Sequence, residues 1–114
     1  AFENVTESDA LYMRTSDGQV GKATAADGTS EAATVIGFAN STQNANFTVK
    51  VIVVGLKTFT TTLDPGDLYF LSPSTAGSIQ KTAPTNAGQA VVRIGEAATS
   101  STLAIQIEPP IKLS

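Results

Sequence analysis

The chain has 114 residues, a mass of 11.7 kDa and a formal net charge of -3, and it contains no cysteine and no histidine. These absences exclude disulfides, thiol nucleophiles, cysteine-based metal sites and catalytic triads that need histidine. The acidic balance and the scattered cations argue against a nucleic-acid partner, and no apolar run approaches the roughly 18 residues of a membrane helix.

Apolar side chains alternate with a period of two along the chain, which is the pattern of β-strands rather than of amphipathic helices. In chain order, the predicted strands cover residues 10–14, 20–23, 34–39, 47–53, 56–62, 67–71, 78–82, 89–97 and 103–108. Residues that favour turns, such as Asp17-Gly18 and Asp27-Gly28, separate these strands. The sequence therefore predicts an all-β fold, a β-sandwich or partly closed β-barrel of about 8–10 short antiparallel strands.

Two parts of the chain resemble each other, residues 9–54 and residues 67–108, at an offset of about 57 residues. Five features recur in the same order and are paired here as first half with second half: residues 9–13 with 67–70, Lys22 with Lys81, Gly28 with Gly88, residues 35–39 with 93–97, and the Phe47 strand with the Leu103 strand. A chance likeness between β-rich segments is the alternative. A true duplication predicts a pseudo-twofold fold in which each half supplies about four strands to one core.

Both ends of the chain differ from the single β domain predicted for residues 9–108. Residues 1–8 have no strand pattern and are predicted to form an N-terminal arm that docks on its own domain or reaches a neighbouring subunit. Residues 109–114 begin with two prolines and are predicted to leave the sheet as an extended edge segment or C-terminal tail. In these two segments, Phe2, Val5, Ile111 and Leu113 are the residues expected to contact another protein subunit.

Few residues suggest chemistry. Asp64 and Asp67 flank a Pro-Gly pair, which indicates a tight turn more strongly than a calcium site. Asp67, Glu96 and Glu108 could be arranged as glycosidase carboxylates, but no tryptophan platform or histidine accompanies them. We therefore expect no enzyme activity, no catalytic residue, no metal and no cofactor.

The sequence contains two tyrosines, Tyr12 and Tyr69. They are placed at equivalent positions of the repeat, inside predicted strands. Exposed aromatic rings of this kind can stack on sugars in carbohydrate-binding modules. Packing at the edge of a sheet or in the core, with the hydroxyl reaching solvent, is the favoured interpretation.

Four segments of the second half carry a resemblance to a known family: residues 65–72 (Pro-Gly-Asp-Leu-Tyr-Phe-Leu-Ser), residues 77–84 (Gly-Ser-Ile-Gln-Lys-Thr-Ala-Pro), residues 88–97 (Gly-Gln-Ala-Val-Val-Arg-Ile-Gly-Glu-Ala) and residues 107–111 (Ile-Glu-Pro-Pro-Ile). In this order they resemble a β module common in structural proteins of tailed bacteriophages, namely head decoration (cement) proteins, head fibres and tail fibre domains. The chain length and the lack of heptads or fibre repeats favour a decoration protein.

The resemblance implies a structural virion protein on the outer surface of the capsid. It implies binding between subunits of the major capsid protein, as a homotrimer or other homo-oligomer, without catalytic residues to carry over. A tail fibre or receptor-binding domain and a glycan-binding adhesion module are the alternatives.

Overall fold

The computed structural model describes residues 1–113, and their fold is all-β, as the sequence predicts. Apart from the strands it contains one short 3-10 turn, η1 (Glu31–Ala33). The strands of the first half are β1 (Ala10–Met13), β2 (Val20–Lys22), β3 (Gly37–Ala39) and β4 (Val51–Ile52). Those that follow are β5 (Gly55–Thr58), β6 (Leu68–Leu71), β7 (Ile79–Gln80), β8 (Ala90–Val91), β9 (Arg93–Ala97), β10 (Thr102–Ile105) and β11 (Ile111–Lys112). No helix in residues 1–113 has the length and apolar character needed to cross a bilayer.

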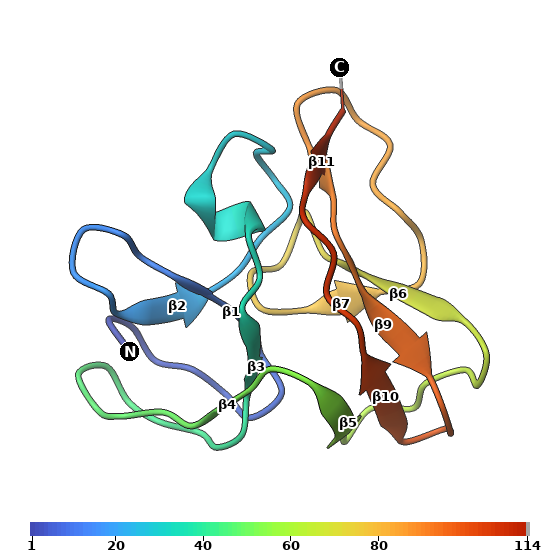
Figure 1. Ribbon diagram of the computed structural model, residues 1–114, viewed down its shortest axis with the longest axis horizontal. Coiled ribbons are helices and arrows are strands. Elements are labelled where there is room, and N and C mark those ends of the chain that lie inside the picture. The colour runs from blue at the N-terminus through green and yellow to red at the C-terminus, as the bar shows by residue number, and fades with distance from the viewer. Residues whose placement is uncertain (114) are drawn as a thin grey trace.

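The strands form two main antiparallel sheets and one small pair. The first sheet has the order β2-β1-β3-β4, and the second has the order β5-β10-β9-β6-β7. Strand β11 pairs with β8 outside these two sheets. In Figure 1 the first sheet lies on the left, with strands coloured blue to green, and the second sheet lies on the right, with strands coloured from green (β5) to dark red (β10). Neither sheet closes into a barrel within the described residues, so the fold is sandwich-like.

The two sheets repeat one strand order. The order β2-β1-β3-β4 in the first sheet corresponds to β7-β6-β9-β10 in the second. The registers correspond as well, because Leu11 pairs with Gly37 in the first sheet and Tyr69 pairs with Gly95 in the second. These pairs match the sequence alignment of residues 35–39 with residues 93–97. The geometry therefore agrees with the predicted repeat, while a common origin of the halves stays a prediction.

Corresponding residues of the two sheets nevertheless have opposite environments. Ala10 and Phe38 are paired in the first sheet, and both are fully buried in the main core. The corresponding pair in the second sheet, Leu68 and Glu96, is exposed. Since side chains alternate between the two faces of a strand, the face that is buried in the first sheet is the open face of the second sheet.

The other two faces show the reverse relationship. Leu11 and Ala39 belong to a small separate cluster on the outer face of the first sheet. Their counterparts in the second sheet, Tyr69 and Ala97, are buried in the main core. A twofold axis would bring the same face of both halves into contact. The pseudo-twofold prediction is therefore wrong for the sheets, because non-corresponding faces of the two sheets pack against each other. We call this a head-to-tail stack.

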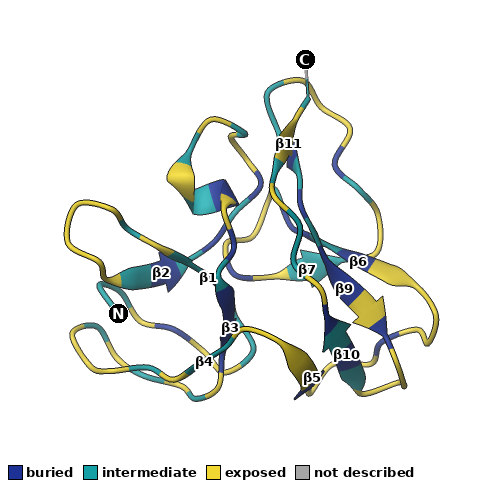
Figure 2. Ribbon diagram, viewed as in Figure 1, coloured by how far each residue is buried: buried dark blue, intermediate teal, exposed yellow. Residues whose placement is uncertain are grey.

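Buried alanines lie where backbone hydrogen bonds join the two halves. Ala23, Ala25 and Ala90 have no exposed surface. The N–H of Ala25 donates to the carbonyl of Ser72 over 3.1 Å, and the N–H of Ala90 donates to the carbonyl of Ala25 over 2.9 Å. Bulkier side chains would compete for the space between these hydrogen-bonded segments. Strand β3 is also tightly enclosed, since Figure 2 shows it buried along its whole length.

Several predicted strands are shorter in the structure, and the largest difference concerns residues 47–53. Only Val51 and Ile52 form β4, because the partner strand β3 extends no further than Ala39, which pairs with Val51. The preceding residues, 41–50, lie in a loop, and the Phe47 side chain is 60% exposed. The alternation of apolar residues in 47–53 thus extends beyond the two residues that have a partner in β3.

Candidate functional site

The N-terminal segment, residues 1–8, is docked on its own domain. The N–H of Phe2 donates to the carbonyl of Val20 over 3.1 Å, which covers the edge of β2. Val5 forms an isolated antiparallel bridge with Gln43 and is only 2% exposed. In this structure Val5 has almost no surface to offer a capsid or another subunit, because it fills the outer cluster of the first sheet.

Phe2 keeps a partly exposed ring. The ring centroids of Phe2 and Tyr12 lie 6.0 Å apart in an edge-to-face arrangement. The guanidinium carbon of Arg14 lies 3.9 Å from the centre of the Phe2 ring. Burial, followed by the nearby carboxylate of Glu31, raises the pKa of the Tyr12 hydroxyl above its usual range. The ring of Tyr12 is therefore partly covered by the N-terminal segment.

Tyr69 is in a different position from Tyr12. Its side chain is 5% exposed, and its hydroxyl oxygen accepts a hydrogen bond of 2.9 Å from the backbone N–H of Asp64. The strand register matches Tyr69 with Leu11 and Tyr12 with Phe70. The prediction of equivalent tyrosines is therefore wrong by one residue, and the two side chains belong to opposite faces of their sheets.

The acidic turn is ion-paired. The N–H of Asp67 donates to the carbonyl of Asp64 over 3.1 Å, and Gly66 has the positive φ of +85° that such turns require. The ammonium of Lys81 contacts the carboxylate of Asp64 and lies 3.8 Å from that of Asp67. The hydrogen bond to Asp64 raises the pKa of Lys81. Residues 1–113 contain no group of three or more acidic side chains placed to hold a metal ion.

The remaining carboxylates considered for catalysis have separate settings. Glu108 accepts a hydrogen bond of 2.8 Å from the guanidinium of Arg93. Glu96 is exposed on the open face of the second sheet, opposite Leu68 on β6 and Ala104 on β10. Two of the three carboxylates thus have cationic partners, and the third lies on a sheet surface.

The C-terminal segment is an extended edge strand, one of the two forms that the sequence predicts. Ile111 lies opposite Val91 in the pair of β11 with β8. The N–H of Leu113 donates to the carbonyl of Gln89, and the N–H of Gly88 donates to the carbonyl of Leu113, both over 2.8 Å. Ser114, the last residue of the predicted tail, lies outside the described residues.

This segment forms one wall of an apolar groove of about 580 Å³, which we call the tail groove. It is lined by Leu68, Phe70, Val91, Arg93, Glu108, Pro109, Pro110 and Ile111. Ile111 is 65% exposed, and Leu68 is 39% exposed. The Arg93–Glu108 ion pair is the only charged part of the lining. The groove lies on the open face of the second sheet, where a protein partner could bury apolar surface.

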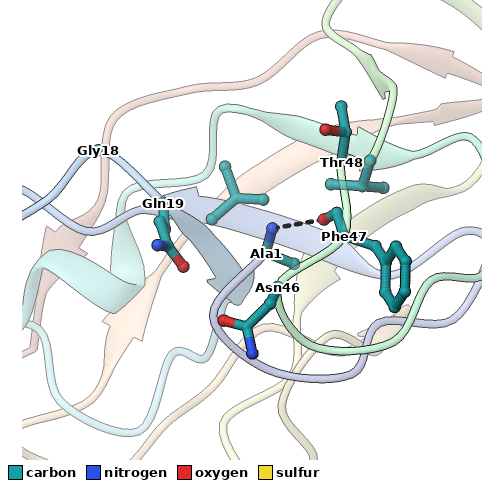
Figure 3. Close-up of a pocket in the computed structure, with 8 residues that line it drawn as sticks. Ala1, Gly18, Gln19, Asn46, Phe47 and Thr48 are labelled. Atoms are coloured by element: carbon teal, nitrogen blue, oxygen red, sulfur yellow. Dashed lines mark hydrogen bonds between the residues drawn. The ribbon is translucent and has the colours of Figure 1, made fainter.

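A second hollow, of about 490 Å³, lies on the first sheet where the N-terminal segment meets the β3–β4 loop. Ala1, Gly18, Gln19, Val20, Asn46, Phe47, Thr48 and Val49 line it. In Figure 3 the terminal amine of Ala1 donates to the carbonyl of Phe47 over 2.9 Å, and the Phe47 ring points away from this bond. We call this hollow and the exposed side chains of Phe47 and Met13 the outer surface of the first sheet.

The sequence identified part of the tail groove and missed the rest. Ile111 was among the expected contact residues, and the structure places it in the wall of the groove. For Leu68, Phe70 and Val91 the sequence pattern predicts only that they lie in strands. Their alternation carried a signal, because Leu68 and Phe70 lie on the face opposite the buried Tyr69, but the pairing of β8 with β11 is a long-range contact that no local pattern reveals.

Comparison with known proteins gives no relative, since no family model, no curated protein and no solved structure matches the chain.

Proposed function

We propose that this protein decorates and stabilises the capsid of a tailed bacteriophage by binding on its outer surface between subunits of the major capsid protein. One observation carries the proposal. Residues 107–111, the last segment of the resemblance to phage structural modules, contribute four residues to the lining of the exposed tail groove. The segment that suggests the family is thus also part of an apolar surface available for binding.

The physical task of such a protein fits this surface. A ligand that binds only the assembled shell stabilises that state by mass action. Many identical copies on a symmetric lattice make individually modest contacts cumulative. A groove of about 580 Å³ with one ion pair is suited to a contact of this modest kind. We propose a homotrimer or other homo-oligomer as the bound form.

We also propose that the chain has no catalytic role and needs no cofactor. Both carboxylates of the acidic turn are ion-paired with Lys81, and Glu108 is ion-paired with Arg93. The glycan-binding alternative has little support from the tyrosines, because Tyr69 is buried and Tyr12 is partly covered by Phe2. A binding surface without chemistry is what these settings favour.

The test is to add the purified protein to capsids that lack it and to image them by electron microscopy. We expect density at symmetry-related positions on the head. Ile111→Glu places a charge in the groove and should reduce the occupancy, whereas Val54→Glu, at a residue 76% exposed in the β4–β5 turn, is the matched control.

Other outcomes would redirect the assignment. Binding only to tails would favour the tail fibre or receptor-binding alternative, and binding to no particle would reject the virion proposal. Equal loss of occupancy with Ile111→Glu and Val54→Glu would show that the tail groove has no specific part in capsid binding.

A further inference from the structure

The open face of the second sheet is the counterpart of a face that the chain covers elsewhere. In the first sheet, the corresponding face carries Ala10, Tyr12 and Phe38 and packs into the main core. In the second sheet it carries Leu68 and Phe70 and forms the floor of the tail groove. The same face of the repeated unit is thus buried in the first half of the chain and open in the second half.

The molecule itself shows what covers this face. In the first sheet it is covered by the inner face of the second sheet, which includes Tyr69, Leu71 and Leu103. According to the strand registers, this inner face of the second sheet corresponds to the outer face of the first sheet, which carries Leu11, Met13 and Val51. A further unit that continued the stack would therefore place the outer face of a first sheet over the tail groove.

The outer face of the first sheet is only partly covered by residues 1–8. Met13 remains 49% exposed, although its counterpart Leu71 is completely buried. Phe47 is 60% exposed beside the hollow of about 490 Å³. The two ends of the stack thus both carry exposed apolar side chains, and the two ends are different surfaces.

Phe47 is presented by a fixed loop. Asn46 has a positive φ of +72°, and its N–H donates to the carbonyl of Ala1 over 2.7 Å. The N–H of Ala45 donates to the Asn4 side chain over 2.8 Å, and the N–H of Phe47 donates to the carbonyl of Asn44 over 3.2 Å. A side chain whose backbone is already ordered loses less conformational freedom on binding, which favours an aromatic anchor at this position.

From this arrangement we propose that the tail groove of one molecule binds the outer surface of the first sheet of a second copy, with Phe47 as the anchor. The inference rests on the proposed function only in taking the bound form to be a homo-oligomer, and it assigns the tail groove to the contact between its copies. The contact is head-to-tail, so it leads to a closed ring or an open chain of copies.

The first test measures self-association without capsids, by sedimentation velocity over a range of protein concentrations. We expect the wild-type protein to form species larger than a monomer. Leu68→Glu in the groove and Phe47→Ser on the anchor should each weaken association at least about tenfold, as expected for a central apolar contact. Val54→Ser is the control, because Val54 is exposed outside both surfaces.

Mixing the two variants distinguishes a head-to-tail contact from a symmetric one. The Leu68→Glu protein keeps an intact anchor, and the Phe47→Ser protein keeps an intact groove. One head-to-tail contact can then form between them, so the mixture should give a one-to-one complex that neither variant gives alone. Thermal unfolding of each variant verifies that it is folded, and Ile111→Glu replaces Leu68→Glu if the latter is not.

A monomeric wild-type protein at all concentrations up to about 1 mM, a generous limit for a weak contact, would overturn the inference. Failure of the folded variants to complement each other would also overturn it. Capsid binding by a monomeric protein, lost in Ile111→Glu, would assign the groove to the capsid protein and leave the decoration function standing. Self-association without capsid binding would have the opposite meaning, because the inference would stand and the proposed function would fail.

Discussion

The ammonium of Lys57 lies 3.3 Å from the carboxylate of Glu7, and this ion pair ties the N-terminal segment to β5. The two partners differ strongly in burial, since the side chain of Lys57 is 3% exposed and that of Glu7 is 53% exposed. The Lys57 ammonium also donates to the carbonyl of Thr58 over 2.9 Å. The N-terminal segment therefore supplies the only carboxylate that is bonded to this buried cation in the described residues.

We expect Glu7→Gln to destabilise the protein more than Lys57→Met does. Glu7→Gln leaves a buried ammonium without its counter-charge, and because Glu7 is half exposed the cost should be about 1 kcal/mol. Lys57→Met removes the buried charge together with its need for a partner and should be neutral or stabilising. Urea unfolding followed by circular dichroism measures both, and the reverse order would contradict the role given to Glu7.

Gly37 and Gly95 are predicted to be intolerant of alanine for the same steric reason. A Cβ atom at Gly37 would lie 2.5 Å from the carbonyl oxygen of Ile52, and one at Gly95 would lie 2.3 Å from that of Ala104. Each carbonyl belongs to the neighbouring strand of the same sheet, so neither can move easily. Gly37→Ala and Gly95→Ala should each cost more than about 2 kcal/mol of the free energy of unfolding.

The control for this pair is Gly66→Ala. Gly66 has open space around it but a positive φ, so alanine there should cost about 1 kcal/mol through backbone strain alone. Equal losses for Gly37→Ala and Gly66→Ala would show that the contact with Ile52 relaxes.

The N-terminal segment should contribute to stability through Val5. This side chain is 2% exposed and packs with Leu11 and Ala39. Val5→Ala should lower the free energy of unfolding by about 2 kcal/mol, because it removes buried methyl groups and leaves a cavity. Thr6→Ala, at the neighbouring exposed position, is the control and should change it by less than about 0.5 kcal/mol. A loss as small as that of the control would mean that the segment is detached in solution.

Asp9 should make stability fall as the pH rises. Burial raises the pKa of its carboxyl above the ordinary value of 3.8, although the hydrogen bond from the Thr6 N–H opposes the shift. A raised pKa in the folded state means that the folded protein binds the proton more tightly than the unfolded chain does. The associated stability is present below pH 3.8 and is lost as the pH rises through the raised pKa. Asp9→Asn should therefore gain stability relative to the wild type between pH 3 and pH 7, as measured by urea unfolding at both values.

Asp17 provides the opposite case. The hydrogen bond from Arg14 lowers the pKa of Asp17, so its stabilisation is present above pH 3.8 and is lost as the pH falls through the lowered value. Asp17→Asn should lose stability relative to the wild type at pH 7 and recover toward it in acid. The same sign of change for both variants would contradict these assignments.

Local patterns in the sequence predict most of the strands and the repeat, because alternation and turn residues are local properties. They fail where an element depends on a distant partner. Residues 47–53 alternate like a strand, but β3 ends before most of them, and residues 1–8 have no pattern although Val5 is buried.

The candidate site was harder to predict for the same reason. Ile111 was expected to be a contact residue, but the groove around it exists only because β11 pairs with β8 beside β6. The alternation of residues 68–71 indicates two faces without indicating which one meets the core. That choice is made by the stacking of the two sheets, which involves residues that are far apart in the chain.

The docked N-terminal segment has the place of the capping unit that closes one end of a repeat array. Here the array has two units, and this segment covers only part of one end, while the described residues contain no equivalent segment over the tail groove. The molecule therefore has a polarity, from a partly covered end to an open one. A head-to-tail assembly of such molecules leaves an exposed apolar groove on its last molecule unless that molecule contacts the first and closes a ring.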